Sequence, residues 1–182
     1  MAALKLFVTL FVLMGHFFGD HPAYANYFKI VDIRSHVNTD TIAFKTLVHD
    51  NNTKFDLYMN LFKPLKAHDL LMSLKLKRKI DGSSKYQTII QLRRIDVCKF
   101  VANNQQKFLM QTVFKVSAHV MSQLACPMKV GEYNITNLSV ATSSFVSSLE
   151  PGNYGFYVEV AQLSGLSVKL LNMQINLRCE KF

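Results

Sequence analysis

The stretch LLMSLKLKRKIDGSSKYQTIIQLRRID, residues 70–96, determines the predicted fold. Its first half alternates apolar and polar side chains, a two-residue period that is typical of a β-strand with one buried face. The apolar positions are Leu70, Met72, Leu74 and Leu76, and the polar ones between them are Ser73, Lys75 and Lys77. Asp81-Gly82-Ser83-Ser84 is a strong turn signal. The alternation resumes at Tyr86, Thr88, Ile90 and Leu92, so the stretch predicts a hairpin with a basic outer face.

The same period predicts six further strands along the chain. They are Phe28–Ile33, Ile42–Val48, Phe55–Leu61, Tyr133–Val140, Tyr154–Gln162 and Leu166–Arg178. Polar residues 36–40 are expected to connect the first two. In the last strand the apolar phase changes by one residue, which predicts a β-bulge near Leu170 and Leu171.

Between Cys98 and Cys126 the period changes to three and four. Apolar residues recur at Leu109, Val113, Val116, Val120 and Leu124, which predicts a helix from about Val101 to Leu124 with one apolar stripe. Eight strands and one helix indicate a mostly β fold, a β-sandwich on which the helix packs or closes a space.

The N-terminus reads as a signal peptide, residues 1–25. Lys5 precedes an apolar run that ends at Phe18, and Ala23-Tyr24-Ala25 is a small-x-small cleavage site. The apolar run is shorter than the roughly 20 residues of a membrane span. We therefore expect residues 26–182 to be a single extracellular domain, secreted and not membrane-spanning.

Three sequons begin at Asn51, Asn134 and Asn137. Export would make them acceptors for N-glycosylation, and two acceptors as close as Asn134 and Asn137 are not expected to be occupied together.

The chain carries 21 Lys and Arg against 12 Asp and Glu, a formal net charge of +9. Its basic residues concentrate at Lys75, Lys77, Arg78, Lys79, Arg93, Arg94 and Lys99. Such a cluster is either a solvated face or a surface for an acidic partner. Nucleic acid is not an expected partner, because no binding motif accompanies the charge and the leader directs the chain out of the cell.

No signature of an enzyme, metal site or cofactor site is present. The chain lacks the G-x-S-x-G turn of acyl transfer, an H-E-x-x-H pair and a glycine-rich phosphate loop. Its histidines after the leader, His36, His49, His68 and His119, are scattered singly. We expect no catalytic residue, no metal and no cofactor.

Three short motifs carry a resemblance to a known family. They are Asp96-Val97-Cys98-Lys99-Phe100, Cys126-Pro127, and Pro151-Gly152-Asn153-Tyr154. In order and spacing they resemble a group of small secreted insect proteins of unknown function that includes the CheB-type chemosensory proteins and is similar to the ML lipid-recognition superfamily. The resemblance runs from about Asp56 to Leu177. It implies an immunoglobulin-like sandwich whose sheets splay apart to admit an apolar ligand.

The resemblance also implies a disulfide between Cys98 and Cys126, with Cys179 left free. The sequence itself leaves open a bond from Cys179 to either of them or to a second chain. Many members of the family have further cysteines in the first strands, whereas residues 26–97 of this chain have none.

The predicted function is that of a carrier, a binding protein for a lipid or another hydrophobic small molecule. The resemblance implies chemosensory, pheromone-related work with a receptor or ion-channel ectodomain as partner. The residues expected to line the ligand site are Phe55, Leu57, Met59, Leu70, Met72, Leu74, Ile90, Leu92, Leu109, Val113, Val116, Phe156, Val158, Val160, Met173 and Ile175. The alternative is a packed domain without ligand that binds a receptor or an acidic membrane surface through its basic hairpin.

Overall fold

The computed structural model describes residues 26–49, 51–66, 69–102, 126–139, 144–164 and 166–181. These residues form eight strands and two short helices. The elements are β1 (Tyr27–Val37), β2 (Ile42–His49), β3 (Lys54–Leu61), β4 (Leu70–Lys79), β5 (Tyr86–Asp96), α2 (Val97–Ala102), β6 (Gly131–Ser139), α5 (Ser144–Ser147), β7 (Gly152–Ser164) and β8 (Leu166–Glu180).

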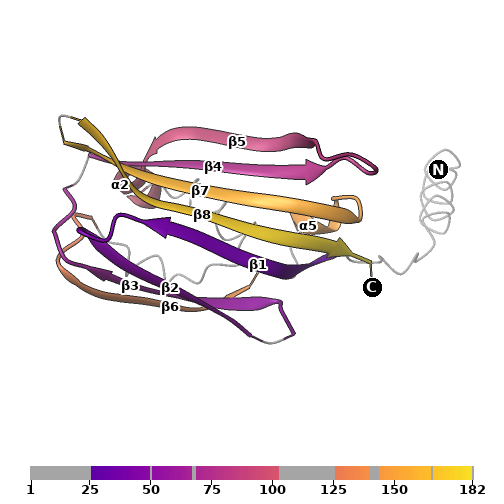
Figure 1. Cartoon of the computed structure of the whole chain (residues 1–182), viewed down its shortest axis with the longest axis horizontal. Coiled ribbons are helices and arrows are strands. Elements are labelled where there is room, and N and C mark those ends of the chain that lie inside the picture. Colours follow the sequence, from indigo (N-terminus) through magenta and orange to yellow (C-terminus); the bar gives the residue numbers. More distant parts are fainter. Residues whose placement is uncertain are drawn as a thin grey trace, which may run out of the picture.

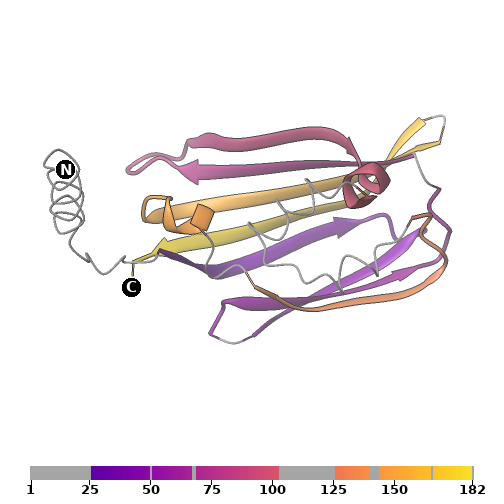
Figure 2. The ribbon, with the colours of Figure 1, turned by 180° about the vertical axis from the view of Figure 1, so that it is seen from behind.

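The strands form two antiparallel sheets that face each other as a β-sandwich. The larger sheet has the order β1-β8-β7-β4-β5, and the smaller has the order β2-β3-β6. Figures 1 and 2 show the smaller sheet next to the β1 side of the larger one, with β5 farthest away. The predicted fold class, a mostly β sandwich of eight strands, is confirmed.

All eight predicted strands are present, although most extend further than predicted. The first strand is the clearest correction, because it continues through Val37 where a polar connection was expected to begin at His36. His36 pairs with Asn172, and Val37 pairs with Leu171. Pairing with the long strand β8 therefore holds polar residues in the extended conformation, which the apolar period alone does not indicate.

The core lies between the sheets and receives side chains from both. Phe55 of β3 and Ile135 of β6 belong to the same buried cluster as Leu74 of β4 and Ile175 of β8. In β8, Met173, Ile175 and Leu177 are buried, whereas the alternating residues face outward. The period of two thus gives each sheet one apolar inner face.

The bulge predicted in the last strand is present. Val160 of β7 pairs with Leu171, and the next residue, Ala161, pairs with Lys169, so Leu170 has no partner on β7. Both Leu170 and Leu171 are buried, and the Leu170 carbonyl accepts a hydrogen bond from the Asn38 N–H at 2.9 Å. The extra residue turns two successive leucines inward.

Helix α2 begins directly after β5, at Val97. The longer helix predicted from about Val101 to Leu124 lies, beyond Ala102, outside the described residues. Within the described ranges, no helix is long and apolar enough to cross a bilayer.

Candidate functional site

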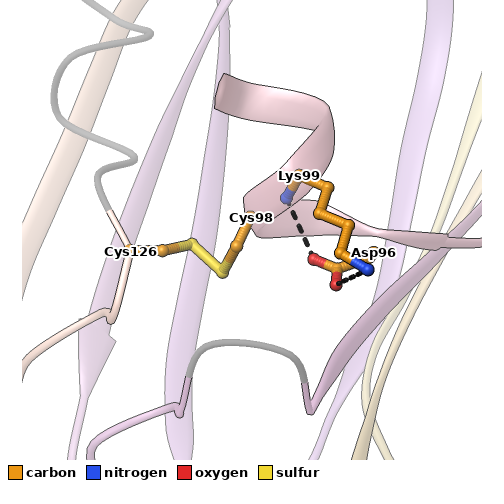
Figure 3. The surroundings of a disulfide bond; sticks show 4 residues. All are labelled: Asp96, Cys98, Lys99 and Cys126. Atoms are coloured by element: carbon orange, nitrogen blue, oxygen red, sulfur yellow. Dashed lines mark hydrogen bonds and ion pairs between the residues drawn. A yellow bond between two sulfur atoms is a disulfide. The ribbon is translucent and has the colours of Figure 1, made fainter. Parts of the chain in front are cut away.

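A disulfide joins Cys98 of α2 to Cys126, as the resemblance implied (Figure 3). Asp96 caps the helix, because its carboxylate accepts a hydrogen bond of 3.0 Å from the backbone N–H of Lys99, the third residue of the helix. Phe100 is buried. The Asp-Val-Cys-Lys-Phe motif therefore supplies, in order, a cap, a covalent link and a core side chain.

The third motif closes the turn into β7. The Tyr154 hydroxyl donates a hydrogen bond of 2.7 Å to the Glu150 carbonyl, and the ring packs edge-on against Phe28 of β1. This arrangement is similar to the tyrosine corner of immunoglobulin-like sandwiches. Gly152 adopts a φ of 148°, a conformation that favours glycine. Burial raises the pKa of Tyr154, so its hydroxyl remains a donor.

Thirteen of the sixteen predicted ligand-site residues fall in the described ranges, and all of them lie in the interior. Leu109, Val113 and Val116 lie outside these ranges. The fully buried ones are Phe55, Leu70, Leu74, Phe156, Met173 and Ile175. The partly buried ones are Leu57, Met59, Met72, Ile90, Leu92, Val158 and Val160. Most of these residues belong to one apolar cluster, whereas Leu70 and Met59 belong to a second one, and Val160 packs against both.

The inner face of the larger sheet becomes more exposed toward β5. On β8, Met173 and Ile175 are buried, whereas on β5 the inward residues Ile90 and Leu92 are only partly buried. No residue of β5 is fully buried. The smaller sheet lies on the β1 side (Figures 1 and 2), so the β4–β5 side receives less cover from its strands.

The outer face of the same sheet carries a basic hollow of about 550 Å³. Because Leu74 and Leu76 point inward, Lys75 and Lys77 point outward, as the sequence predicted. The residues that line the basic hollow are Ser73, Lys75, Lys77, Arg93, Arg94, Tyr157, Val158, Glu159 and Asn172. Strand order aligns Arg93 and Arg94 of β5, Ser73 of β4, Glu159 of β7 and Asn172 of β8 in one row.

A bulge in β5 brings both arginines to this hollow. Met72 pairs with Ile95 and Leu74 pairs with Leu92, so two residues oppose Ser73. Arg94 has a φ of 51°, and its N–H donates a hydrogen bond of 3.2 Å to the Ser73 hydroxyl. In a regular strand, two successive side chains face opposite sides of the sheet. A prediction from strict alternation therefore does not place both arginines in one site, whereas the bulge does.

Tyr157 forms part of the lining. The Lys77 ammonium lies 5.4 Å from the centre of its ring. The ring crosses over Gly155, where a Cβ atom would come within 2.8 Å of it, so the missing side chain makes room for the ring. Burial raises the pKa of Tyr157, with a smaller contribution from Tyr86, which keeps the hydroxyl protonated at neutral pH.

Arg78, Lys79 and Lys99 do not line this hollow, which corrects the cluster drawn from sequence. Arg78 follows the inward phase of β4 and forms an ion pair with Glu150, while its guanidinium also donates to the Pro151 carbonyl at 3.3 Å. Lys99 pairs with Asp96 at 3.8 Å. The charges of Arg78 and Lys99 are therefore already balanced by neighbouring carboxylates.

A carboxylate on the smaller sheet forms a second polar cluster that the sequence did not indicate. Asp56 accepts hydrogen bonds from the Asn137 N–H at 2.8 Å and the Tyr58 hydroxyl at 3.1 Å, and lies 2.9 Å from the His49 imidazole. Burial opposes its charge, but the three hydrogen bonds together lower the pKa of Asp56. Asn137 is exposed at a β6 bulge with a φ of 59°. His49 lies diagonally across the β2–β3 hairpin from Asp56, which pairs with Leu47, and no pattern in the sequence indicates this contact.

Cys179 is free and buried on the inner face of β8, and burial raises the pKa of its thiol. This confirms the pairing that the resemblance implied, in which Cys98 and Cys126 are bonded and Cys179 is free. Within the described ranges, no group of three or more His, Cys, Asp or Glu side chains is placed to hold a metal ion.

Residues 71–156 match the model of a family described as "Protein of unknown function (DUF1091)". The matched region contains both cysteines of the disulfide, strand β6 and the turn into β7. No curated protein matches the chain significantly. A DUF1091 domain is thus found in this chain, in agreement with its resemblance to a family of unknown function.

Proposed function

We propose that this protein is a secreted binding protein for a lipid or another hydrophobic small molecule, related to the CheB-type and ML proteins. The observation that carries the proposal is the partly buried apolar inner face on the β5 side of the larger sheet. Ile90 and Leu92 of β5 and Val158 of β7 contribute to this surface next to the fully buried core. A hydrocarbon chain is the ligand that such a surface suits best.

Burial of apolar surface provides the binding energy. Each Å² removed from water contributes about 25 cal/mol, so an acyl chain is held without covalent chemistry. Methionine adds adaptability, since Met72 lies partly buried on this face and its unbranched side chain fits ligands of different shape. We propose that such a carrier solubilises a hydrophobic cue outside the cell and presents it to a receptor or channel ectodomain.

A matched pair of substitutions in β5 tests the ligand site. Leu92 points inward, and its neighbour Gln91, which pairs with Lys75, points outward. Leu92→Arg is expected to abolish binding of a fluorescent fatty-acid analogue, because an unpaired charge in an apolar site is strongly disfavoured. Gln91→Arg introduces the same side chain on the opposite face and should preserve binding.

Thermal unfolding of both variants shows whether Leu92→Arg still folds. If the folded Leu92→Arg variant binds the analogue as the wild type does, the ligand does not lie on this face. If the wild type binds neither fatty-acid nor sterol analogues, the carrier function is wrong, and the alternative of a packed interaction domain replaces it.

A further inference from the structure

We propose that the basic hollow on the outer face of the larger sheet binds a sulfated carbohydrate chain. The proposal goes beyond lipid binding and rests on the proposed function only in requiring export from the cell. Four cationic side chains of two neighbouring strands line the hollow: Lys75, Lys77, Arg93 and Arg94.

These four cations are available to an external anion. Among the residues that the structure describes, none of the four forms an ion pair. The one acidic residue in the lining, Glu159, is paired with Lys169 at 3.0 Å. The site therefore keeps an excess of positive charge, and its two arginines provide the planar donors that suit oxyanions.

The other groups of the hollow point to a sugar rather than to an isolated ion. The Asn172 amide and the Tyr157 hydroxyl offer donors beside the cations, and the Glu159 carboxylate offers an acceptor. These groups complement sugar hydroxyls, and the volume of about 550 Å³ lies in the range of small-ligand sites.

The shape and lining favour a carbohydrate over a bilayer surface. The cations line a hollow, whereas a bilayer is flat and meets side chains that protrude. Apart from Val158, which alternates toward the inner face, all lining residues are polar or charged or carry the hydroxyl of tyrosine. The large apolar side chains exposed on this hairpin, Ile80, Tyr86 and Ile89, are not among them.

The predicted N-glycans would leave the hollow accessible. Asn134 and Asn137 lie on β6, and Asn51 lies in the turn between β2 and β3, so all three acceptors belong to the smaller sheet. The hollow lies on the larger sheet, on the face directed away from the core.

The test uses the secreted protein and a fluorescent heparin tetrasaccharide, with binding followed by anisotropy. We expect saturable binding that weakens as salt is added, since screening acts on exposed charges. Lys75→Gln combined with Arg93→Gln should weaken it by roughly tenfold or more, because each lost charge-assisted hydrogen bond has an effect of that order. Lys45→Gln combined with Lys129→Gln removes the same charge from other, exposed positions and should change binding by less than about twofold.

Two results would overturn the proposal: the absence of tetrasaccharide binding, and an equal loss in both double variants. If the tetrasaccharide does not bind but phosphatidylserine vesicles do, the surface is assigned to a membrane. The fatty-acid analogue is measured on the same samples, so failure of the carbohydrate site and failure of the lipid site are distinguished.

Discussion

The backbone N–H of Arg94 donates a hydrogen bond of 3.2 Å to the side-chain hydroxyl of Ser73 on the neighbouring strand. A second bulge, in β6, has the same arrangement, because the N–H of Asn137 donates a hydrogen bond of 2.8 Å to the Asp56 carboxylate of β3. Both donors have positive φ values, 51° for Arg94 and 59° for Asn137. In each sheet, therefore, a side chain of the opposite strand holds a left-handed residue in a bulge.

The first prediction concerns the backbone at Arg94. A left-handed conformation costs a non-glycine residue about 1 kcal/mol or more, so Arg94→Gly should raise the free energy of unfolding by up to about 1 kcal/mol. It should also weaken tetrasaccharide binding, since it removes a cation. Arg93→Gly is the control and should destabilise the protein, because Arg93 has no positive φ and glycine at such a position only adds conformational freedom to the unfolded chain. Equal destabilisation in both variants, measured by urea unfolding, would contradict this account of the bulge.

Acid stability should depend on Asp56. Its pKa in the folded protein is lowered from the ordinary value of 3.8, so its ionised form stabilises the fold above that value. This contribution should be lost as the pH falls from 3.8 through the lower pKa of the folded state. Asp56→Asn keeps an oxygen acceptor for Asn137 and should unfold with a smaller dependence on pH in that range. An unchanged pH profile of the urea midpoint would show that the carboxylate has no such role.

The disulfide should contribute about 3 kcal/mol to stability, since it closes a loop of 28 residues in the unfolded chain. Replacing both Cys98 and Cys126 with serine should lower the free energy of unfolding by that order. Cys179→Ala is the comparison, because this thiol is buried but unbonded. Non-reducing peptide mapping should recover the Cys98–Cys126 link, and a Cys179 link in its place would be incompatible with the structure.

Export should remove the leader before Asn26. Asn26 is buried, and its amide donates to the Ser147 and Leu149 carbonyls, so the expected first residue of the mature chain is anchored in the fold. N-terminal sequencing of the protein from culture medium should begin at Asn26. Full-length protein in the membrane fraction would refute the removal of the leader.

The exported protein should also carry N-glycans. Intact mass before and after enzymatic deglycosylation should show N-glycans that Asn51→Gln reduces.

The strands were predictable from sequence because one buried face imposes a period of two, as in Leu74 and Leu76 against Lys75 and Lys77. The phase change at Leu170 and Leu171 even predicted a bulge. The bulges at Arg94 and Asn137 were not predicted, since each depends on a hydrogen bond to another strand rather than on a local pattern. The sequence predicted a basic face but not a hollow. Glu159 and Asn172 lie beside the basic residues only because the strand order places β7 next to β4 and β8 next to β7.

The most direct test of the carrier function is native mass spectrometry of the secreted protein, followed by organic extraction. We expect a species heavier than the protein by the mass of a lipid or another hydrophobic molecule, which extraction removes and Leu92→Arg fails to retain. A wild-type protein that carries no such molecule after secretion, and takes up none from a mixture of fatty acids and sterols, is not a carrier of hydrophobic molecules.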